Sequence, residues 1–294
     1  MRSKHSRLTR CVILSSQQYG RNRRACGLYV SVLNFVGSSN SSQNLKQVWF
    51  PGVHSNIGGG EAEQELQDIT LAWMMSQMRE ACHIEFDEDY VQILFGPKAP
   101  IPNYRNWSSG LIDTRNFLWV YHIAGTHHVR YPGQYFVVDG ETGAAVHDPP
   151  HSNFLKPLEN TQERFHSSVR IRLARNGPGI NDKGTYIAEA LTPHRWRDWN
   201  GRKRHGWTCE RVKSDEDVEL AAEVQKCFPH EEKAQFLWRS KSAGSEKGKL
   251  LAEETKEKWP KVLIEDVLGH YEKMLMERDV SVMQVWDKLP SQFS

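Results

Sequence analysis

The sequence predicts an α/β fold, in which short buried strands alternate with amphipathic helices. The apolar run Val48–Phe50 is typical of a buried strand, and a Pro-Gly pair directly after it ends the run. After three consecutive glycines, apolar residues recur at helical spacing from Leu66 to Ala81, with acidic residues at the front and Arg79 near the end. A strand, a glycine-rich turn and a helix in this order form one α/β unit.

The composition is that of a folded protein. The 294 residues include 10 Trp, 9 Tyr and 11 Phe, and 38% are hydrophobic, which excludes a disordered chain. The longest apolar run, residues 28–36, is shorter than the roughly 20 residues that span a bilayer, so we expect no transmembrane segment. Five cysteines without a C-x-x-C pair favour free thiols in a reducing compartment, and we expect a cytoplasmic protein.

Charge separates the beginning of the chain from the rest. The net charge is only +2, yet none of the 36 acidic residues precedes Glu61. Residues 1–43 therefore form a basic, acid-free head, which we expect to be a disordered arm or a misassigned start of the coding sequence. A mitochondrial transit peptide has a similar composition, but it also requires an amphipathic helix, and the apolar residues here cluster instead.

Two further segments complete the expected organisation. Residues 44–194 are expected to form the main domain, in which residues 169–173 alternate apolar and basic side chains and predict a half-exposed strand or one helical turn. Residues 195–294 are expected to be a helical and loop-rich extension. Charge and apolar patterns predict helices near 215–227 and 264–277, with a charged linker near 240–258.

His54 is the candidate catalytic residue. It comes shortly after the predicted strand and before Gly58, Gly59 and Gly60, which allow close approach of the backbone and open a helix. In α/β hydrolases a histidine in a loop after a late strand takes the proton of the nucleophilic serine. The alternative interpretation of a lone histidine beside glycines is a turn residue.

The surroundings of His54 give weaker indications. The three glycines match neither the dinucleotide-binding pattern nor the P-loop pattern, so nucleotide binding is not expected. Asp68, near the front of the predicted helix, is a candidate supporting residue. It is equally well explained as an acidic residue that interacts favourably with the helix dipole.

The segment Val48–Gly60, VWFPGVHSNIGGG, followed by DITLAWM at Asp68–Met74, resembles the signature of an α/β-hydrolase family. That family is common in fungi, was long filed as a domain of unknown function, and is similar to the catalytic domain of type VI secretion phospholipase effectors. Similar segments continue at residues 107–114, 130–135, 166–173 and 265–275, so the resemblance covers about residues 44–277.

The resemblance implies that His54 is the catalytic histidine of a serine hydrolase that cleaves an ester, with a lipid as the substrate class. Asn56, the three glycines and Asp68 would support it, and the scheme needs no metal or organic cofactor. Two positions depart from the family pattern, since Asn56 and Glu61 stand where many members have Asp and Tyr.

The larger departure is a missing nucleophile. No G-x-S-x-G occurs in the chain, and in this fold the serine and the acid precede the histidine. We therefore expect a partial α/β-hydrolase-like domain, its C-terminal half only, that is inactive as this chain alone.

Two other candidate sites are weaker. His127, His128, His147 and His151 fit no metal-site spacing, so no metal is expected. The segment 195–207 holds three tryptophans and the basic residues Arg195, Arg197, Arg202, Lys203 and Arg204. It could make the chain a non-enzymatic module that binds nucleic acid or an anionic membrane, or its arginines could pack on the tryptophans. With the hydrolase interpretation, no nucleic-acid partner is expected.

Overall fold

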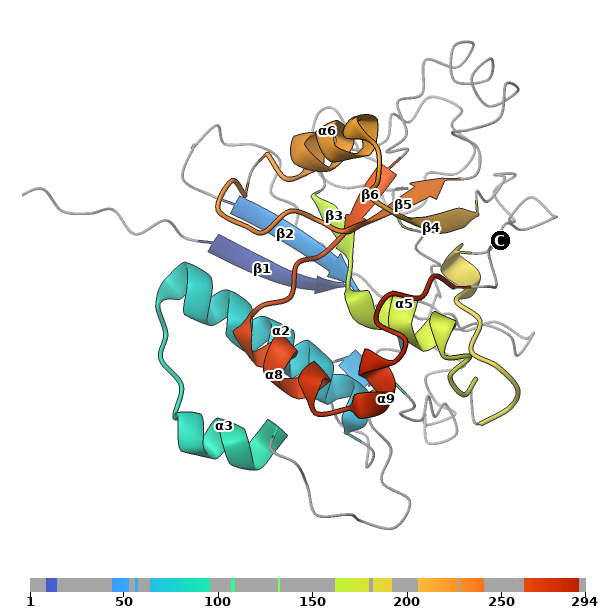
Figure 1. Ribbon diagram of the computed structural model, residues 1–294. Helices are drawn as coiled ribbons and strands as arrows, with labels where there is room; N and C mark the ends of the chain where they lie inside the picture. Colours follow the sequence, from blue (N-terminus) through green and yellow to red (C-terminus); the bar gives the residue numbers. More distant parts are fainter. Residues whose placement is uncertain are drawn as a thin grey trace, which may run out of the picture.

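The computed structural model describes residues 9–14, 44–52, 56–57, 64–95, 107–108, 132, 162–179, 182–191, 206–226, 228–240 and 262–290. Its centre is a six-stranded sheet with the strand order β1-β2-β3-β6-β5-β4 (Figure 1). The strands are β1 (Thr9–Leu14), β2 (Asn44–Trp49), β3 (Glu163–Phe165), β4 (Trp207–Arg211), β5 (Phe236–Ser240) and β6 (Val262–Glu265). β1, β2, β3 and β6 are parallel, and β5 is antiparallel to both of its neighbours. The predicted α/β class is confirmed.

Side chains of the strands alternate between two buried faces of the sheet, as strand geometry requires. On one face Trp49 and Phe165 join the aromatic residues of β4 and β5 and pack on α5 (Ser167–Ala174) and the 3₁₀ helix η1 (Glu189–Leu191). On the other face Val48 and Phe50 pack on α2 (Glu65–Cys82). Both faces are buried, although β2 and β3 also carry polar and charged residues that are buried, among them Lys46, Glu163 and Arg164.

Two helices, α2 and α8 (His270–Glu277), run side by side below the sheet in Figure 1. Gly269 permits their close approach, because a Cβ there would lie 2.3 Å from Ser76 Cβ. Ser76 Oγ accepts the Tyr271 N–H at 3.1 Å, which fixes the start of α8 on α2. This contact holds the C-terminal part of the chain against the segment that follows His54 in sequence.

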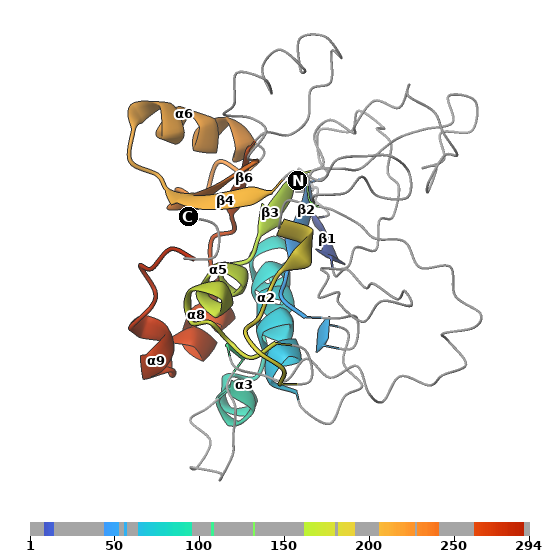
Figure 2. The same cartoon turned by 90° about the vertical axis from the view of Figure 1, so that its right-hand side faces the viewer.

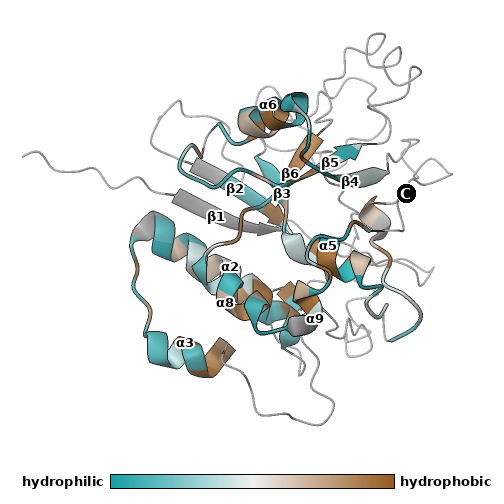
Figure 3. Ribbon diagram, viewed as in Figure 1, coloured by the Kyte–Doolittle hydropathy of each residue, from teal (hydrophilic) through white to brown (hydrophobic). Residues whose placement is uncertain are grey.

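Three other helices complete the described part. α3 (Glu88–Phe95) packs through Val91 and Phe95 beside Tyr271, and α9 (Val280–Met283) follows α8. α6 (Asp215–Val224) covers the apolar side chains of β5 and β6, and in Figure 2 it lies beside β4 and β6, far from α3. Figure 3 shows β6 as hydrophobic, in agreement with its place inside the sheet.

Several expected elements are confirmed. The helix predicted over 66–81 is α2, the strand at 48–50 is the end of β2, and the helix near 215–227 is α6. Residues 169–173 lie in a helix, but the expected half exposure is wrong: Arg170 and Arg172 are fully buried. Their guanidinium groups have partners inside the protein, which alternation in the sequence does not reveal.

The expected helical extension 195–294 is corrected by the structure, because it supplies β4, β5 and β6 to the same sheet as β1–β3. β4 has a short alternating burial pattern, whereas β5 and β6 are almost continuously buried. The helix expected over 264–277 is a strand followed by α8, with Gly269 between them. The charged linker near 240–258 lies outside the described residues apart from Ser240, which ends β5.

The expected boundary at residue 43 is also corrected. β1 lies inside the head 1–43 and pairs in parallel with all six residues of β2, from Thr9 opposite Asn44 to Leu14 opposite Trp49. This part of the head is therefore a strand of the sheet, not a disordered arm. The remainder of the head lies outside the described residues.

Candidate functional site

The carboxyl ends of β2, β3 and β6 lie next to one another in the sheet. The backbone pairing continues one residue past the strands, since the His166 N–H donates to the Trp49 carbonyl at 2.9 Å and the Asp266 N–H donates to the Phe165 carbonyl at 2.7 Å. In open α/β sheets this edge is where ligands bind. Residues 50–52, which precede His54 in the sequence, leave β2 at the same edge.

His54 itself lies outside the described residues, as do Gly58, Gly59 and Gly60. Its two described flanking residues are both buried, Gly52 before it and Asn56 after it. Gly52 has φ +116°, and a Cβ on it would lie 2.8 Å from Asn56 Cβ. The two flanks therefore meet closely, and only glycine fits the first of them.

Asp68, the other supporting residue suggested by the sequence, lies in the first turn of α2 and is 8% exposed. Its N–H donates to the Gln64 carbonyl at 2.9 Å. Asp68 therefore sits at the positive end of the helix dipole, which is the structural role that the sequence allowed. A role beside His54 stays a prediction.

A buried hydrogen-bonded series joins β3, α5 and α8. His166 Nδ1 accepts the Ser168 N–H at 3.1 Å and lies 2.8 Å from Ser168 Oγ, and His166 Nε2 lies 3.0 Å from Glu272 Oε1. The other Glu272 oxygen accepts the Gly269 N–H at 2.9 Å. Because a backbone N–H can only donate, we assign the ring proton of His166 to Nε2, from which it donates to Glu272.

The same series contains the residue types of a serine hydrolase triad, but these three residues stabilise the fold and are not arranged for catalysis. Ser168, His166 and Glu272 are each 0% exposed, so no substrate carbonyl reaches the hydroxyl. His166 is the N-cap of α5, and its ring nitrogen is already occupied by the backbone of that helix. Ser168 is therefore not the missing nucleophile.

A cluster of four charges lies next to this edge: Lys46, Arg164 and Asp266 are buried, and the side chain of Glu231 is 15% exposed. Lys46 Nζ lies 2.8 Å from Glu231 Oε1 and 3.0 Å from Asp266 Oδ1, and Arg164 Nη1 lies 2.9 Å from the same Asp266 oxygen. The second Asp266 oxygen accepts the Trp73 indole N–H at 2.9 Å. Two cations and two anions balance, which makes the burial of Lys46, Arg164 and Asp266 tolerable.

The pKa values of this cluster follow from its charges. Burial alone would raise the pKa of Asp266, but Lys46 and Arg164 outweigh it and hold that pKa below its ordinary value. Burial alone would lower the pKa of Lys46, yet Asp266 and Glu231 raise it above its ordinary value. The pKa of Arg164 is likewise raised by Asp266 and Glu231, so Lys46, Arg164 and Asp266 stay charged at neutral pH.

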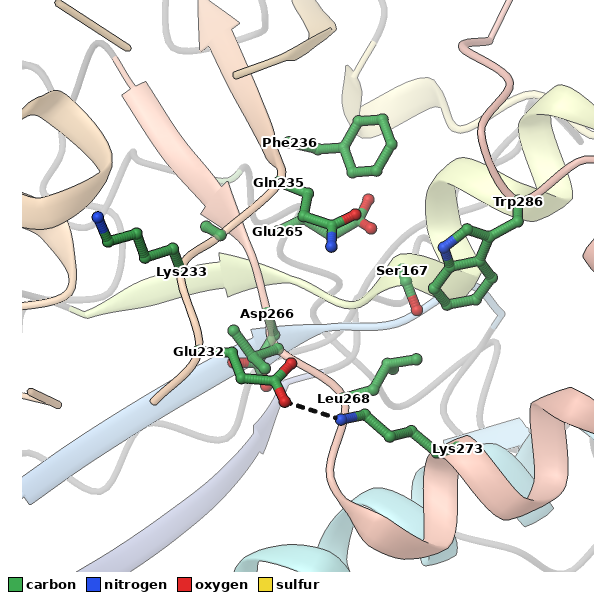
Figure 4. A pocket seen from close by; sticks show the side chains of 12 residues that line it. Ser167, Glu232, Lys233, Gln235, Phe236, Glu265, Asp266, Leu268, Lys273 and Trp286 are labelled. Carbon is green, nitrogen blue, oxygen red and sulfur yellow. Dashed lines mark hydrogen bonds and ion pairs between the residues drawn. The ribbon is translucent and has the colours of Figure 1, made fainter. Parts of the chain in front are cut away.

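A small pocket with a volume of about 130 Å³ opens at the end of β6 (Figure 4). Ser167, Phe236, Leu268 and Trp286 line it, and the Lys273 ammonium lies 3.2 Å from Glu232 Oε1 at its rim. Arg170 forms a bidentate pair with the lining residue Glu265 at 2.8 and 3.0 Å. Both oxygens of this carboxylate are thus already used within the protein.

The expected binding patch falls largely outside the described residues, since Arg195, Arg197, Arg202, Lys203 and Arg204 are all there. Trp207, the last tryptophan of the segment, is 3% exposed and packs edge-on against Phe165 with ring centroids 5.8 Å apart. This tryptophan is therefore part of the core and is not available for stacking on a base. Binding by the other residues stays a prediction.

Within the described residues, no group of three or more His, Cys, Asp or Glu side chains could hold a metal ion. The four histidines weighed as a metal cluster, residues 127, 128, 147 and 151, lie outside that part. No helix in the described part of the chain is long and apolar enough to cross a membrane.

Comparison with known families gives one match. Residues 4–77 match the family described as the type VI secretion system (T6SS) phospholipase effector Tle1-like catalytic domain. This match covers about a quarter of the chain and includes β1, β2, the position of His54 and most of α2. No curated protein and no solved structure matches the chain.

The extent of the match bears on the head of the chain. Because it starts at residue 4, it includes most of residues 1–43, where the sequence predicted a disordered arm or a misassigned start and where no family resemblance was noted. The match and the pairing of β1 with β2 both join this segment to the body of the protein.

His166, Glu272 and Asp266 are not among the site residues that the sequence predicted. His166 and Glu272 lie 106 residues apart, and neither has a helical or strand periodicity that would bring it to the other. Their only signal was that both fall in segments with family resemblance, 166–173 and 265–275. Asp266 directly follows the apolar strand β6. It therefore lies at the carboxyl end of that strand, the edge of an open α/β sheet at which ligands bind.

Proposed function

We propose that this chain carries the histidine-bearing part of a serine-type ester hydrolase that acts on a lipid, with His54 as the base. The observation that carries this proposal is the match of residues 4–77 to a phospholipase effector catalytic domain. The parallel strands support it as well, because residues 50–52, which lead to His54 in the sequence, leave the carboxyl end of β2, where catalytic loops of α/β hydrolases lie.

The proposed reaction is acyl transfer to serine and then to water. The serine hydroxyl attacks the ester carbonyl while His54 takes its proton, and backbone N–H groups stabilise the oxyanion. His54 then gives the proton to the leaving alcohol, and the acyl-enzyme is hydrolysed by a water that His54 activates. An acidic residue orients His54 throughout, and no step needs a metal or an organic cofactor.

The nucleophile of this reaction is not found in the chain. It has no G-x-S-x-G, and Ser168 is sealed inside the protein. We therefore propose that the chain is inactive alone and needs a serine from another polypeptide segment. We also propose a cytoplasmic location, which the free thiol of Cys209 supports.

Two measurements test the proposal. The purified chain is treated with a serine-directed fluorophosphonate probe, and we expect no labelling; labelling of any serine would contradict the proposed inactivity. The chain is then fused after the serine-bearing part of a phospholipase effector catalytic domain and assayed on phosphatidylcholine vesicles.

The fusion tests the role of His54. We expect it to release fatty acid, and His54→Gln to lower that rate by about 10³-fold or more. His230→Gln, at an exposed histidine, is the matched control and should retain the rate. Equal activity of the His54 and His230 variants would refute His54 as the base.

A further inference from the structure

His166 occupies a position between three elements, at the carboxyl end of β3. Its backbone N–H donates to the carbonyl of Trp49, the last residue of β2. Its ring bonds to α5 through Nδ1 and to α8 through Nε2, at 3.1 Å to the Ser168 N–H and 3.0 Å to Glu272. One side chain thus connects two helices at the carboxyl ends of β2 and β3.

The ring of His166 also contacts Phe50, the residue that directly follows β2. Phe50 stacks on His166 with ring centroids 4.6 Å apart and an angle of 22° between the planes. Phe50 is fully buried, and it leads directly into Pro51, Gly52 and the three residues 53–55 that include His54. The stack therefore sets the direction in which the backbone leaves β2.

Burial alone does not require polar residues at this place. An apolar pair of similar volume often stabilises a protein as well as a buried polar or ionic pair. What the polar pair adds is orientation: Glu272 accepts from Nε2, Ser168 donates to Nδ1, and the ring plane is fixed from both sides. A fixed ring plane in turn fixes the stacked Phe50.

We propose that His166 is a positioning residue for Phe50 and for the described residues 51, 52, 56 and 57, which flank His54 in the sequence, and that Glu272 holds its ring in the plane that orients Phe50. The inference rests on the proposed function only in naming His54 as the base. The mechanical link from α8 through His166 to Phe50 is independent of that assignment. It makes the C-terminal helix α8 a determinant of the geometry of the candidate site.

The first test is the tautomer of His166 in the intact chain. Nitrogen-15 NMR of the histidine side chains, with His166 assigned by its loss in His166→Asn, should show a ring proton on Nε2 and none on Nδ1. A ring protonated on Nδ1, or on both nitrogens, would overturn the proposal, because Nδ1 would no longer accept from Ser168.

The second test is hydrogen exchange of the backbone in three variants. His166→Asn retains an acceptor for the Ser168 N–H but removes the ring and the bond to Glu272. Glu272→Gln retains an oxygen for Nε2 but loses the acceptor of the Gly269 N–H. Ser168→Ala, which retains the backbone N–H, is the matched control.

We expect His166→Asn to accelerate exchange in residues 50–57 by about tenfold or more, with Glu272→Gln intermediate and Ser168→Ala unchanged. Peptides of β5 and β6 should change by less than about twofold. Unchanged exchange in residues 50–57, or equal acceleration over the whole sheet, would overturn the proposal. If His166→Asn does not fold, the exchange of residues 50–57 in Glu272→Gln and the position of the ring proton of His166 test the proposal.

These results are distinguishable from a failure of the proposed function. Exchange in residues 50–57 reports on positioning and needs no catalysis, whereas the His54→Gln fusion reports on the base. In the active fusion, Glu272→Gln should lower kcat by about fivefold or more while KM changes by less than about twofold, since substrate binding does not involve His166. A changed KM with an unchanged kcat would contradict positioning of the base.

Discussion

Lys46 Nζ lies 3.0 Å from Asp266 Oδ1, and their side chains are 2% and 0% exposed. Lys46 is in β2 and Asp266 directly follows β6, and β3 lies between these two strands. The ion pair therefore reaches across β3 on the face of the sheet that α2 covers. Arg164, on the intervening strand, shares the same Asp266 oxygen. The carboxylate is therefore the point that joins three strands and, through Trp73, the helix that covers them.

Asp266→Asn should strongly destabilise the fold. The substitution leaves two buried cations with Glu231 as their remaining anion, and breaking a buried pair in this way costs about 3–5 kcal/mol. Chemical denaturation at pH 7 measures the loss. Asp287→Asn removes an ion pair to Arg211 from a side chain that is 73% exposed, and it should cost less than about 1 kcal/mol. Equal losses for the two variants would contradict the importance assigned to the cluster.

The stability of the protein should depend on pH through the same carboxylate. The pKa of Asp266 is lowered in the folded state from its ordinary value of 3.8, so its contribution is complete above that value and is lost as the pH falls below it. Denaturation between pH 6 and pH 2.5 should show a fall in the free energy of unfolding near the acidic end. Asp266→Asn should have a smaller fall over this range, and an identical slope would contradict the assignment.

The sequence predicted the class of the fold and its local elements better than its organisation. Val48–Phe50 and the pattern from Leu66 to Ala81 were sufficient to predict β2 and α2. The spacing of apolar residues along a short segment indicates which face of that segment is buried. The strands β4 to β6 were missed in a segment rich in charges. Their place in the sheet depends on pairing between distant residues, such as Leu237 with Ile264, which no local pattern contains.

The candidate site was predictable only in part. Chemistry in the sequence pointed to His54, and Gly52 and Asn56 on either side are indeed buried and in close approach. The sequence predicts a half-exposed strand or one helical turn at residues 169–173, because alternating basic residues usually face solvent. Arg170 and Arg172 are buried since Glu265 and the Pro178 carbonyl, respectively, lie within 3.0 Å of their guanidinium groups.

Gly52→Ala should disturb the close approach of Gly52 and Asn56, which flank His54 in the sequence. The position has φ +116°, and the new methyl group would lie 2.8 Å from Asn56 Cβ, so backbone strain and overlap combine to cost about 2 kcal/mol or more. Thermal denaturation measures this loss. Gly184→Ala, at φ +65° with no atom within 4 Å, isolates the backbone strain at about 1 kcal/mol. A Gly52 variant no worse than the Gly184 variant would show that the contact with Asn56 is unimportant.

Cys209 should be unreactive in the folded protein. The side chain is buried in β4, and burial raises the pKa of its thiol well above the ordinary value of 9.0, with Glu265 adding to the rise. Little thiolate is therefore present at pH 8. Iodoacetamide followed by peptide mass spectrometry should leave Cys209 unmodified without denaturant and modify it in guanidinium chloride. Rapid native alkylation would mean that β4 opens readily.

Arg170→Lys should release the end of the chain from the sheet. Besides its bidentate pair with Glu265, Arg170 donates to the carbonyls of Trp286 and Lys288, and its guanidinium lies 3.8 Å from the centroid of the Phe236 ring.

A lysine has one ammonium and cannot replace this planar set of donors, so we expect a loss of about 2–4 kcal/mol. Hydrogen exchange should accelerate most in residues 280–290. Arg175→Lys is the control, because Arg175 is 23% exposed and lies 3.5 Å from Asp279; it should cost less than about 1 kcal/mol. If the two variants loosened residues 280–290 equally, the attachment would have to be assigned to α9 and not to Arg170.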